Sequence, residues 1–141
     1  MRELHAGCAQ LVRRAILTIA ALPDREARFH QYRNSMPEPV RDAADSYGYD
    51  APKTRFRPTP RDVDRVLEVL SWLTWLETRN DGARDVKIIV ARAFGAPWWK
   101  LAHRYGRSDD TMRRWEAGAI AAITMRFWRA IDRMTAGDSP S

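Results

Sequence analysis

The stretch Pro97–Ala117 constrains the fold of this 141-residue chain more than any other. Gly106 stands between two short amphipathic runs and supplies the left-handed backbone that ends one helix and turns the chain. Ser108 then provides an N-cap for a second helix, in which Met112 and Trp115 recur at helical spacing on the buried side. Short helices joined by a tight turn that contains glycine are typical of a helix-turn-helix motif. The stretch therefore predicts this motif, with the helix after Ser108 as its recognition helix.

The outward face of the predicted motif carries basic and polar side chains. Arg113 and Arg114 lie on the exposed side of the second helix, where a guanidinium group can make two hydrogen bonds to the edge of a guanine. Lys100, Arg104 and Arg107 flank the motif and suit phosphate groups. The alternative interpretation of each cation is a solvated surface charge. The full set of expected DNA-binding residues is Lys100, Arg104, Arg107, Ser108, Asp110, Thr111, Arg113 and Arg114.

Two acidic residues, Asp109 and Asp110, stand at the start of the predicted recognition helix. They suit the positive end of the helix dipole, but they repel nearby phosphate groups. Either carboxylate can instead accept a hydrogen bond from a cytosine amino group and so select a sequence. We therefore expect base reading to rest one turn later, on Arg113 and Arg114.

The charge distribution favours a polyanionic partner. Residues 84–133 contain eleven Lys or Arg against five Asp or Glu, and this net +6 equals the net charge of the whole chain. The single cysteine, Cys8, excludes an intramolecular disulfide, and the three histidines have no acidic or cysteine partner at metal-ligand spacing. The sequence has no phosphate-binding glycine loop, nucleophile motif or metal signature. We expect no cofactor, no enzymatic activity and a cytoplasmic location.

Apolar residues at three- and four-residue spacing predict further helices. One extends from Arg2 to about Leu22, with Arg13 and Arg14 on its polar side. A short one is expected over Glu38–Tyr47, with a proline in its first turn. Another covers Ala83–Phe94, and its buried face consists of Val86, Ile89, Val90 and Ala93.

A strong helix start lies at Thr59, which acts as N-cap, followed by Pro60 and Asp62 in the first turn. The helix is expected to run to about Glu77. Trp72 and Trp75 are placed on the flanks of its apolar stripe. The stripe itself consists of Val63, Val66, Leu67, Leu70, Leu73 and Leu76.

The helix after Ser108 is expected to continue for about 25 residues, because apolar residues recur at helical spacing as far as Met134. Gly118 is the point at which we expect it to bend. We predict a single all-α domain of five to seven helices with this long recognition helix at its C-terminal end. Its parts are an N-terminal helical segment (1–47), a linker (48–60), a helix-turn-helix region (61–136) and a disordered tail (137–141).

The linker contains three prolines and carries Lys53, Arg55 and Arg57 without balancing acids after Asp50. As a basic arm it would follow a phosphate backbone or enter a minor groove. The alternative is a solvated connector with no binding role.

Several runs of this sequence resemble a family of small uncharacterised proteins that phages and prophage-like elements of bacteria encode. The runs are Arg57–Pro60, Leu70–Glu77, Ile89–Lys100, and Arg113–Trp115 with Ala119. Members of that family are similar to the promoter-reading fourth region of bacterial sigma factors in their helix-turn-helix. The resemblance covers about residues 55–128 and implies binding to double-stranded DNA, in phage gene control or in genome packaging beside a large terminase. This chain departs from its relatives at Arg107, Asp109 and Asp110.

The preferred hypothesis is a phage- or prophage-type transcription regulator that reads the major groove. The first alternative is a small terminase subunit that recognises a packaging site and forms a ring-shaped homo-oligomer. The second is an adaptor that binds RNA polymerase or another phage protein through the apolar ridge of the last helix. None of the three involves a membrane, because no apolar run approaches the roughly 18–20 residues of a membrane span.

Overall fold

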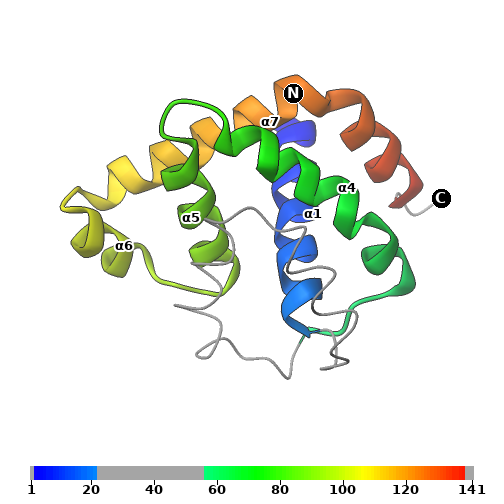
Figure 1. Ribbon diagram of the computed structural model, residues 1–141, viewed down its shortest axis with the longest axis horizontal. Helices are drawn as coiled ribbons and strands as arrows, with labels where there is room; N and C mark the ends of the chain where they lie inside the picture. The colour runs from blue at the N-terminus through cyan, green and yellow to red at the C-terminus, as the bar shows by residue number, and fades with distance from the viewer. Residues whose placement is uncertain (1, 22–55, 139–141) are drawn as a thin grey trace.

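The structure is a computed structural model that describes residues 2–21 and 56–138, and within these ranges it is helical with no strand (Figure 1). The helices are α1 (Arg2–Ala21), α4 (Pro60–Glu77), α5 (Gly82–Ala93), α6 (Trp98–Tyr105) and α7 (Asp109–Asp138). The expected all-α class of five to seven helices is confirmed. The expected helix over 38–47 and two residues of the basic arm, Lys53 and Arg55, lie outside the described residues. In the described part, no helix has the length and apolar character needed to cross a membrane.

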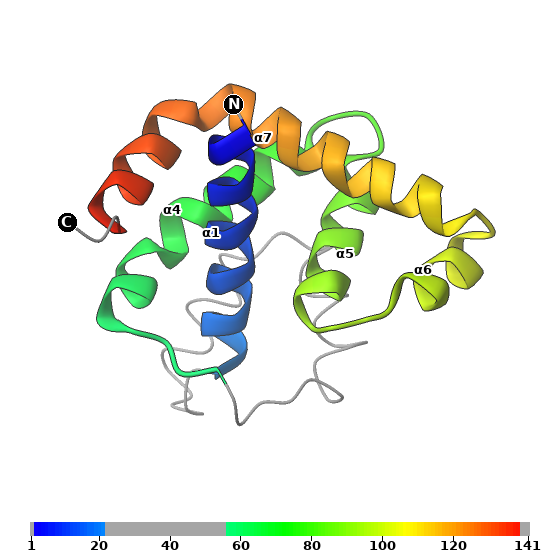
Figure 2. The same ribbon diagram turned by 180° about the vertical axis from the view of Figure 1, so that it is seen from behind.

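Helix α7 runs along the molecule and joins its two ends (Figure 1). Its first turns contact α6, and its later turns contact α1 and α4, while α5 contacts both α4 and α7. Figure 2 shows the same arrangement from behind, with α6 at the opposite end of the molecule from the last turns of α7. α1 therefore shares a core with the helices of the region 61–136. α7 itself continues to Asp138, two residues into the segment predicted as a tail.

Helix α5 is buried on two faces. Val86, Ile89, Val90 and Ala93 belong to the larger core cluster, which they share with α1, α4 and the later part of α7. Ile88 and Ala91 belong to a second cluster with α6 and the start of α7. The four residues of the expected face are buried as predicted, whereas burial of the second face was not predicted. α5 thus connects the core beneath the predicted motif to the core of the rest of the molecule.

The buried face of α4 includes four residues of the predicted stripe, Val66, Leu70, Leu73 and Leu76, and differs from the prediction at Leu67 and Trp72. Leu67, expected inside, is 50% exposed, whereas Trp72, expected on a flank, is 1% exposed. Trp72 stacks on Phe127 of α7 with 5.7 Å between ring centroids, and Trp75 meets the same ring edge-on at 5.5 Å. The prediction for Leu67 was wrong because α4 contacts α1, α5 and α7 together, and these contacts turn its tryptophan side inward.

The bend in α7 lies at Phe127, the one residue inside this helix with non-helical backbone angles (φ −120°, ψ 25°). The prediction of a bend at Gly118 was therefore wrong. Gly118 is exposed, whereas Phe127 contacts both tryptophans of α4, so the bend coincides with tertiary packing. After the bend, Arg65 of α4 donates a hydrogen bond to the carbonyl oxygen of Met134 at 2.9 Å.

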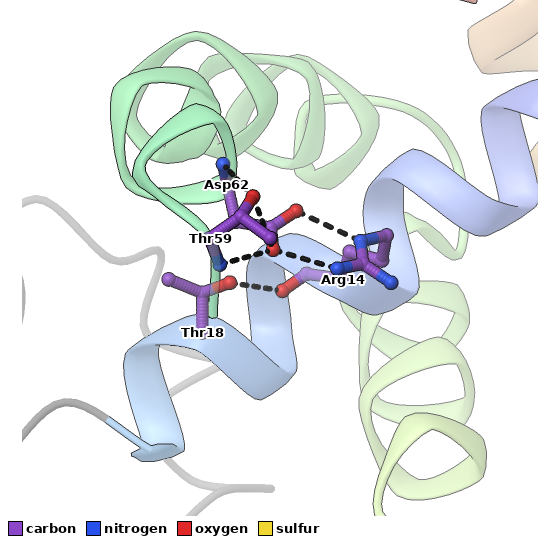
Figure 3. Close-up of polar contacts among 4 residues, drawn as sticks. All are labelled: Arg14, Thr18, Thr59 and Asp62. Atoms are coloured by element: carbon purple, nitrogen blue, oxygen red, sulfur yellow. Dashed lines mark hydrogen bonds and ion pairs between the residues drawn. The ribbon is translucent and has the colours of Figure 1, made fainter. Parts of the chain in front are cut away.

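An ion pair fixes α1 to the start of α4 (Figure 3). Nε and Nη2 of Arg14 donate to the two carboxylate oxygens of Asp62 at 2.8 and 2.7 Å. Asp62 also accepts from the backbone N–H of Thr59 at 2.8 Å, and its own N–H donates to Oγ1 of Thr59 at 3.1 Å. This reciprocal capping box confirms the predicted helix start. Arg14 lies on the polar side of α1 as predicted, but its pairing with Asp62 had no signal in the sequence, because the two residues are 48 positions apart.

This ion pair makes stability depend on pH. Hydrogen bonds from Arg14 lower the pKa of Asp62 from 3.8 to about 2, against the opposing effect of burial. Because the folded-state pKa is the lower one, the carboxylate stabilises the fold above about pH 4, and this contribution disappears as the pH falls towards about 2. We expect Asp62→Asn to cost about 1–2 kcal/mol in the free energy of unfolding near neutral pH, since Arg14 is partly exposed to solvent.

Urea unfolding of wild type and Asp62→Asn across this pH range measures the effect. The matched control is Asp64→Asn, which removes the same charge from an exposed position of α4. A gap between wild type and Asp62→Asn that persists unchanged to about pH 2 would contradict the assignment.

Candidate nucleic-acid interface

The turn between α6 and α7 has the geometry that the sequence predicts. Gly106 is in the left-handed conformation (φ 64°, ψ 35°), and the N–H of Arg107 donates to the carbonyl oxygen of Ala102 at 3.0 Å. Oγ of Ser108 accepts from the N–H of Thr111 at 3.1 Å, which is an N-cap hydrogen bond. No atom lies within 4 Å of a Cβ built on Gly106, so its backbone angles rather than lack of space require glycine. The turn and the cap are confirmed.

The two helices of the motif pack on a small apolar core of their own. Leu101, Ala102 and Met112 are buried at 1%, 8% and 0% exposure, and the buried position of Met112 is the one that the sequence predicts. Below them lie Ile88 and Ala91 of α5. This core holds α6 and α7 at a fixed angle, so the side chains on their outer surfaces are presented on a rigid support.

Trp115, also predicted to face inward, is half-buried beneath a cation–π contact. The guanidinium carbon of Arg84 lies 3.7 Å from the centroid of the Trp115 ring, and Tyr105 meets that ring edge-on at 6.4 Å. Arg84 also donates to a carboxylate oxygen of Asp85 at 3.0 Å. Arg84 is one of the eleven cations of residues 84–133, and its contact with Trp115 joins α5 to α7.

A second aromatic contact involves Trp98 at the start of α6. Arg92 of α5 lies 4.2 Å and Arg113 of α7 lies 5.5 Å from the centroid of its ring. Arg92 also donates to the carbonyl oxygen of Ala96 at 2.8 Å. Trp98 is half-buried, whereas its neighbour Trp99 is 63% exposed.

The same region of α7 contains a partly buried acid, Glu116. Burial raises its pKa above the ordinary value, and the positive charge of Arg92 acts in the opposite direction. Glu116 is half-buried in α7. The acids on the outer surface at the start of α7 are Asp109 and Asp110, both exposed.

A chain of polar contacts occupies the first turns of α7. Nε of Arg114 lies 3.3 Å from Oδ2 of Asp110, and Nη2 of Arg114 donates to Oγ1 of Thr111 at 3.3 Å. That hydroxyl lies 3.0 Å from Oγ of Ser108, the N-cap. The spacing of Asp110 and Arg114, four residues apart on one helix, was a signal in the sequence for this pair.

The eight expected site residues lie on α6, the turn and the first two turns of α7. All are exposed except Thr111, which is half-buried. The structure brings Ser108, Asp110, Thr111 and Arg114 together, whereas Arg113 is directed to Trp98. Arg57, the one described residue of the expected basic arm, is exposed.

Comparison with known proteins gives a family without an assigned activity. The family described as a domain of unknown function (DUF6362) matches residues 20–123. No curated protein and no solved structure matches this chain. The matched range contains α4, α5, α6 and the first half of α7, and thus the whole candidate interface.

Proposed function

The chain belongs to the DUF6362 family, and we propose that it is a phage- or prophage-type transcription regulator that reads the major groove of double-stranded DNA. The observation that carries this proposal is the pair α6 and α7, joined by the Gly106 turn and supported by its own core. Arg113 and Arg114 project from the outer surface of α7, the helix that enters the groove in this motif.

In this proposal the two helices have different tasks. The first turns of α7 contact base edges, while Lys100, Arg104 and Arg107 hold the phosphate backbone on either side. The protein acts without a cofactor and meets its DNA in the cytoplasm. Several other cations of the basic region are engaged within the protein, among them Arg84, Arg92 and Arg133. We therefore expect direct contacts with phosphate groups from only a subset of the eleven cations between residues 84 and 133.

The dependence of affinity on salt tests this proposal. With about four phosphate contacts, the logarithm of the association constant is expected to fall with the logarithm of salt concentration with a slope of about −3 to −4. Between 50 and 200 mM salt, this amounts to a roughly 100-fold loss of affinity. Lys100→Ala is expected to reduce the slope by about one unit. Fluorescence anisotropy of a labelled duplex measures both quantities.

The control is Arg129→Ala, which removes the same charge from an exposed position in the later part of α7 and should leave the slope unchanged. A flat response to salt would overturn DNA binding.

That outcome would favour a second candidate, an adaptor that binds RNA polymerase or another phage protein. Met125 and Trp128 lie one turn apart on α7 and are 65% and 46% exposed. Exposed apolar side chains on one helix surface are a feature of protein interfaces. This pair lies in the later part of α7, so an adaptor role would use a different surface from the proposed DNA contacts.

A further inference from the structure

We propose that Asp110 is a positioning residue that directs Arg114 towards a guanine and so contributes to the choice of DNA sequence. The inference rests on the proposed function, because it concerns the same interface. It assigns different roles to Asp109 and Asp110, which have the same charge and are adjacent at the start of α7.

The contacts of Arg114 hold its guanidinium group from one side. Asp110 lies 3.3 Å from Nε, and Thr111 accepts a hydrogen bond from Nη2 at 3.3 Å. Thr111 is itself fixed by Ser108, through a contact of 3.0 Å between the hydroxyls and an N-cap hydrogen bond of 3.1 Å. The orientation of Arg114 is thus linked to the backbone at the end of the turn.

The donors that these contacts leave available are the ones that guanine recognition needs. A guanidinium group has five N–H donors, one on Nε and two on each terminal nitrogen. Within the described part of the chain, Asp110 engages Nε of Arg114, and Thr111 accepts a hydrogen bond from one N–H of Nη2. Each terminal nitrogen therefore keeps at least one N–H, and two such donors side by side match O6 and N7 of guanine in the major groove.

Asp110 and Asp109 differ in what they contact. Asp110 is one helical turn before Arg114 and pairs with it, whereas in the described residues no ion pair engages Asp109. Both are exposed and both lie near the positive end of the helix dipole. The difference between them is the contact with Arg114. Removing the charge of Asp109 therefore controls for the effect on DNA binding of losing one negative charge at the start of α7.

The pair is well suited to orientation and poorly suited to stabilising the fold. Arg114 is 71% and Asp110 81% exposed, and such surface pairs contribute little to folding. Holding a flexible arginine in its binding geometry before it meets DNA reduces the entropy that binding must remove. The negative charge of Asp110 also repels phosphate, so it weakens binding to every duplex while favouring the one with guanine at this position.

The experiment compares two duplexes, the one enriched from a random pool by the wild-type protein and the same duplex with the contacted guanine replaced by adenine. Their affinity ratio measures discrimination. Asp109→Asn is expected to strengthen binding to both duplexes equally and leave the ratio unchanged. Asp110→Asn is expected to strengthen binding to the adenine duplex but to lower the ratio roughly fivefold, the lower end of what one bidentate contact provides. Asp110→Glu keeps the carboxylate one turn from Arg114 and should retain most of the ratio.

Combination with Arg114→Ala identifies the route by which Asp110 acts. In that background Asp110→Asn should no longer change the ratio, because the positioned residue is gone. If Asp110→Asn behaves like Asp109→Asn, the positioning role is wrong and Asp110 only repels phosphate. If it changes base preference equally with and without Arg114, Asp110 reads a base directly and the proposal is again wrong. Failure of the proposed function looks different, because the wild-type protein would then enrich no sequence from the pool.

Discussion

Replacing Arg113 and Arg114 together with alanine is expected to abolish the preference for one duplex sequence while the fold remains intact. The affinity for the preferred duplex should fall at least roughly 100-fold, because the double variant loses a bidentate base contact and a charge-assisted contact to phosphate. Both side chains are exposed, so thermal unfolding should be close to that of wild type. Titration of the preferred duplex and of a scrambled one measures the affinity for the preferred sequence and the preference for it.

The single variants separate the two arginines. Arg114→Ala is expected to remove discrimination between duplexes, since Arg114 lies in the polar chain with Asp110. Arg113→Ala is expected to weaken all duplexes to a similar extent, because Arg113 rests against Trp98 and is suited to a fixed phosphate contact. The matched control is Arg126→Ala with Arg129→Ala, the same loss of charge from exposed positions farther along α7. Unchanged discrimination in the Arg113 and Arg114 double variant would rule out base reading by this part of α7.

The largest effect on stability is expected from Trp72→Ala. Trp72 is 1% exposed and stacks on Phe127 where α7 bends, so its loss leaves a large cavity between α4 and α7. Such truncations cost about 3–5 kcal/mol, a large part of the roughly 5–15 kcal/mol that stabilises a typical domain. Urea unfolding followed by circular dichroism measures the loss.

Two control variants separate the effect of burial on the unfolding free energy from the effect of the type of side chain removed. Trp128→Ala removes the same side chain from a position that is 46% exposed, and we expect it to cost less than about 1 kcal/mol. Leu67→Ala tests the residue that sequence periodicity placed inside α4 and that is 50% exposed in the structure. An unfolding free energy for Trp72→Ala close to that of Trp128→Ala would contradict the packing of α4 against α7.

The stability variants and the arginine variants act on different parts of the protein, because its described part has two hydrophobic cores. The core beneath α6 and the start of α7 is separate from the cluster that contains Trp72, and α5 and α7 connect the two. Destabilising the larger cluster therefore affects the interface only through these helices. Variants of Arg113 and Arg114, by contrast, change exposed side chains of α7. Arg113 contacts the smaller core through the ring of Trp98, so the two sets of variants report largely on separate properties of the protein.

Much of the candidate site could be predicted because it depends on neighbours in the sequence. The left-handed turn at Gly106, the cap at Ser108 and the buried positions Leu101 and Met112 follow from local backbone preferences and helical spacing. The pair Asp110 and Arg114 also has a local signal, four residues apart on one helix. The contacts of Trp98 with Arg92 and Arg113 have no such signal, because three different helices bring these side chains together.

The sequence by itself determined where α4 and α7 begin and where α6 ends, since caps and turns are set by residues within one helical turn of each other. Only the tertiary structure decided that Trp72 rather than Leu67 is buried in α4, where α7 bends and which charge Arg14 neutralises. Helical periodicity marks a broad apolar face, and the neighbouring helices select which part of that face is buried. Trp72 is buried and Leu67 exposed because α4 packs against Phe127 of α7 on the side of Trp72. Arg14 and Asp62 meet for the same reason: two helices that are distant in the sequence cross at the start of α4.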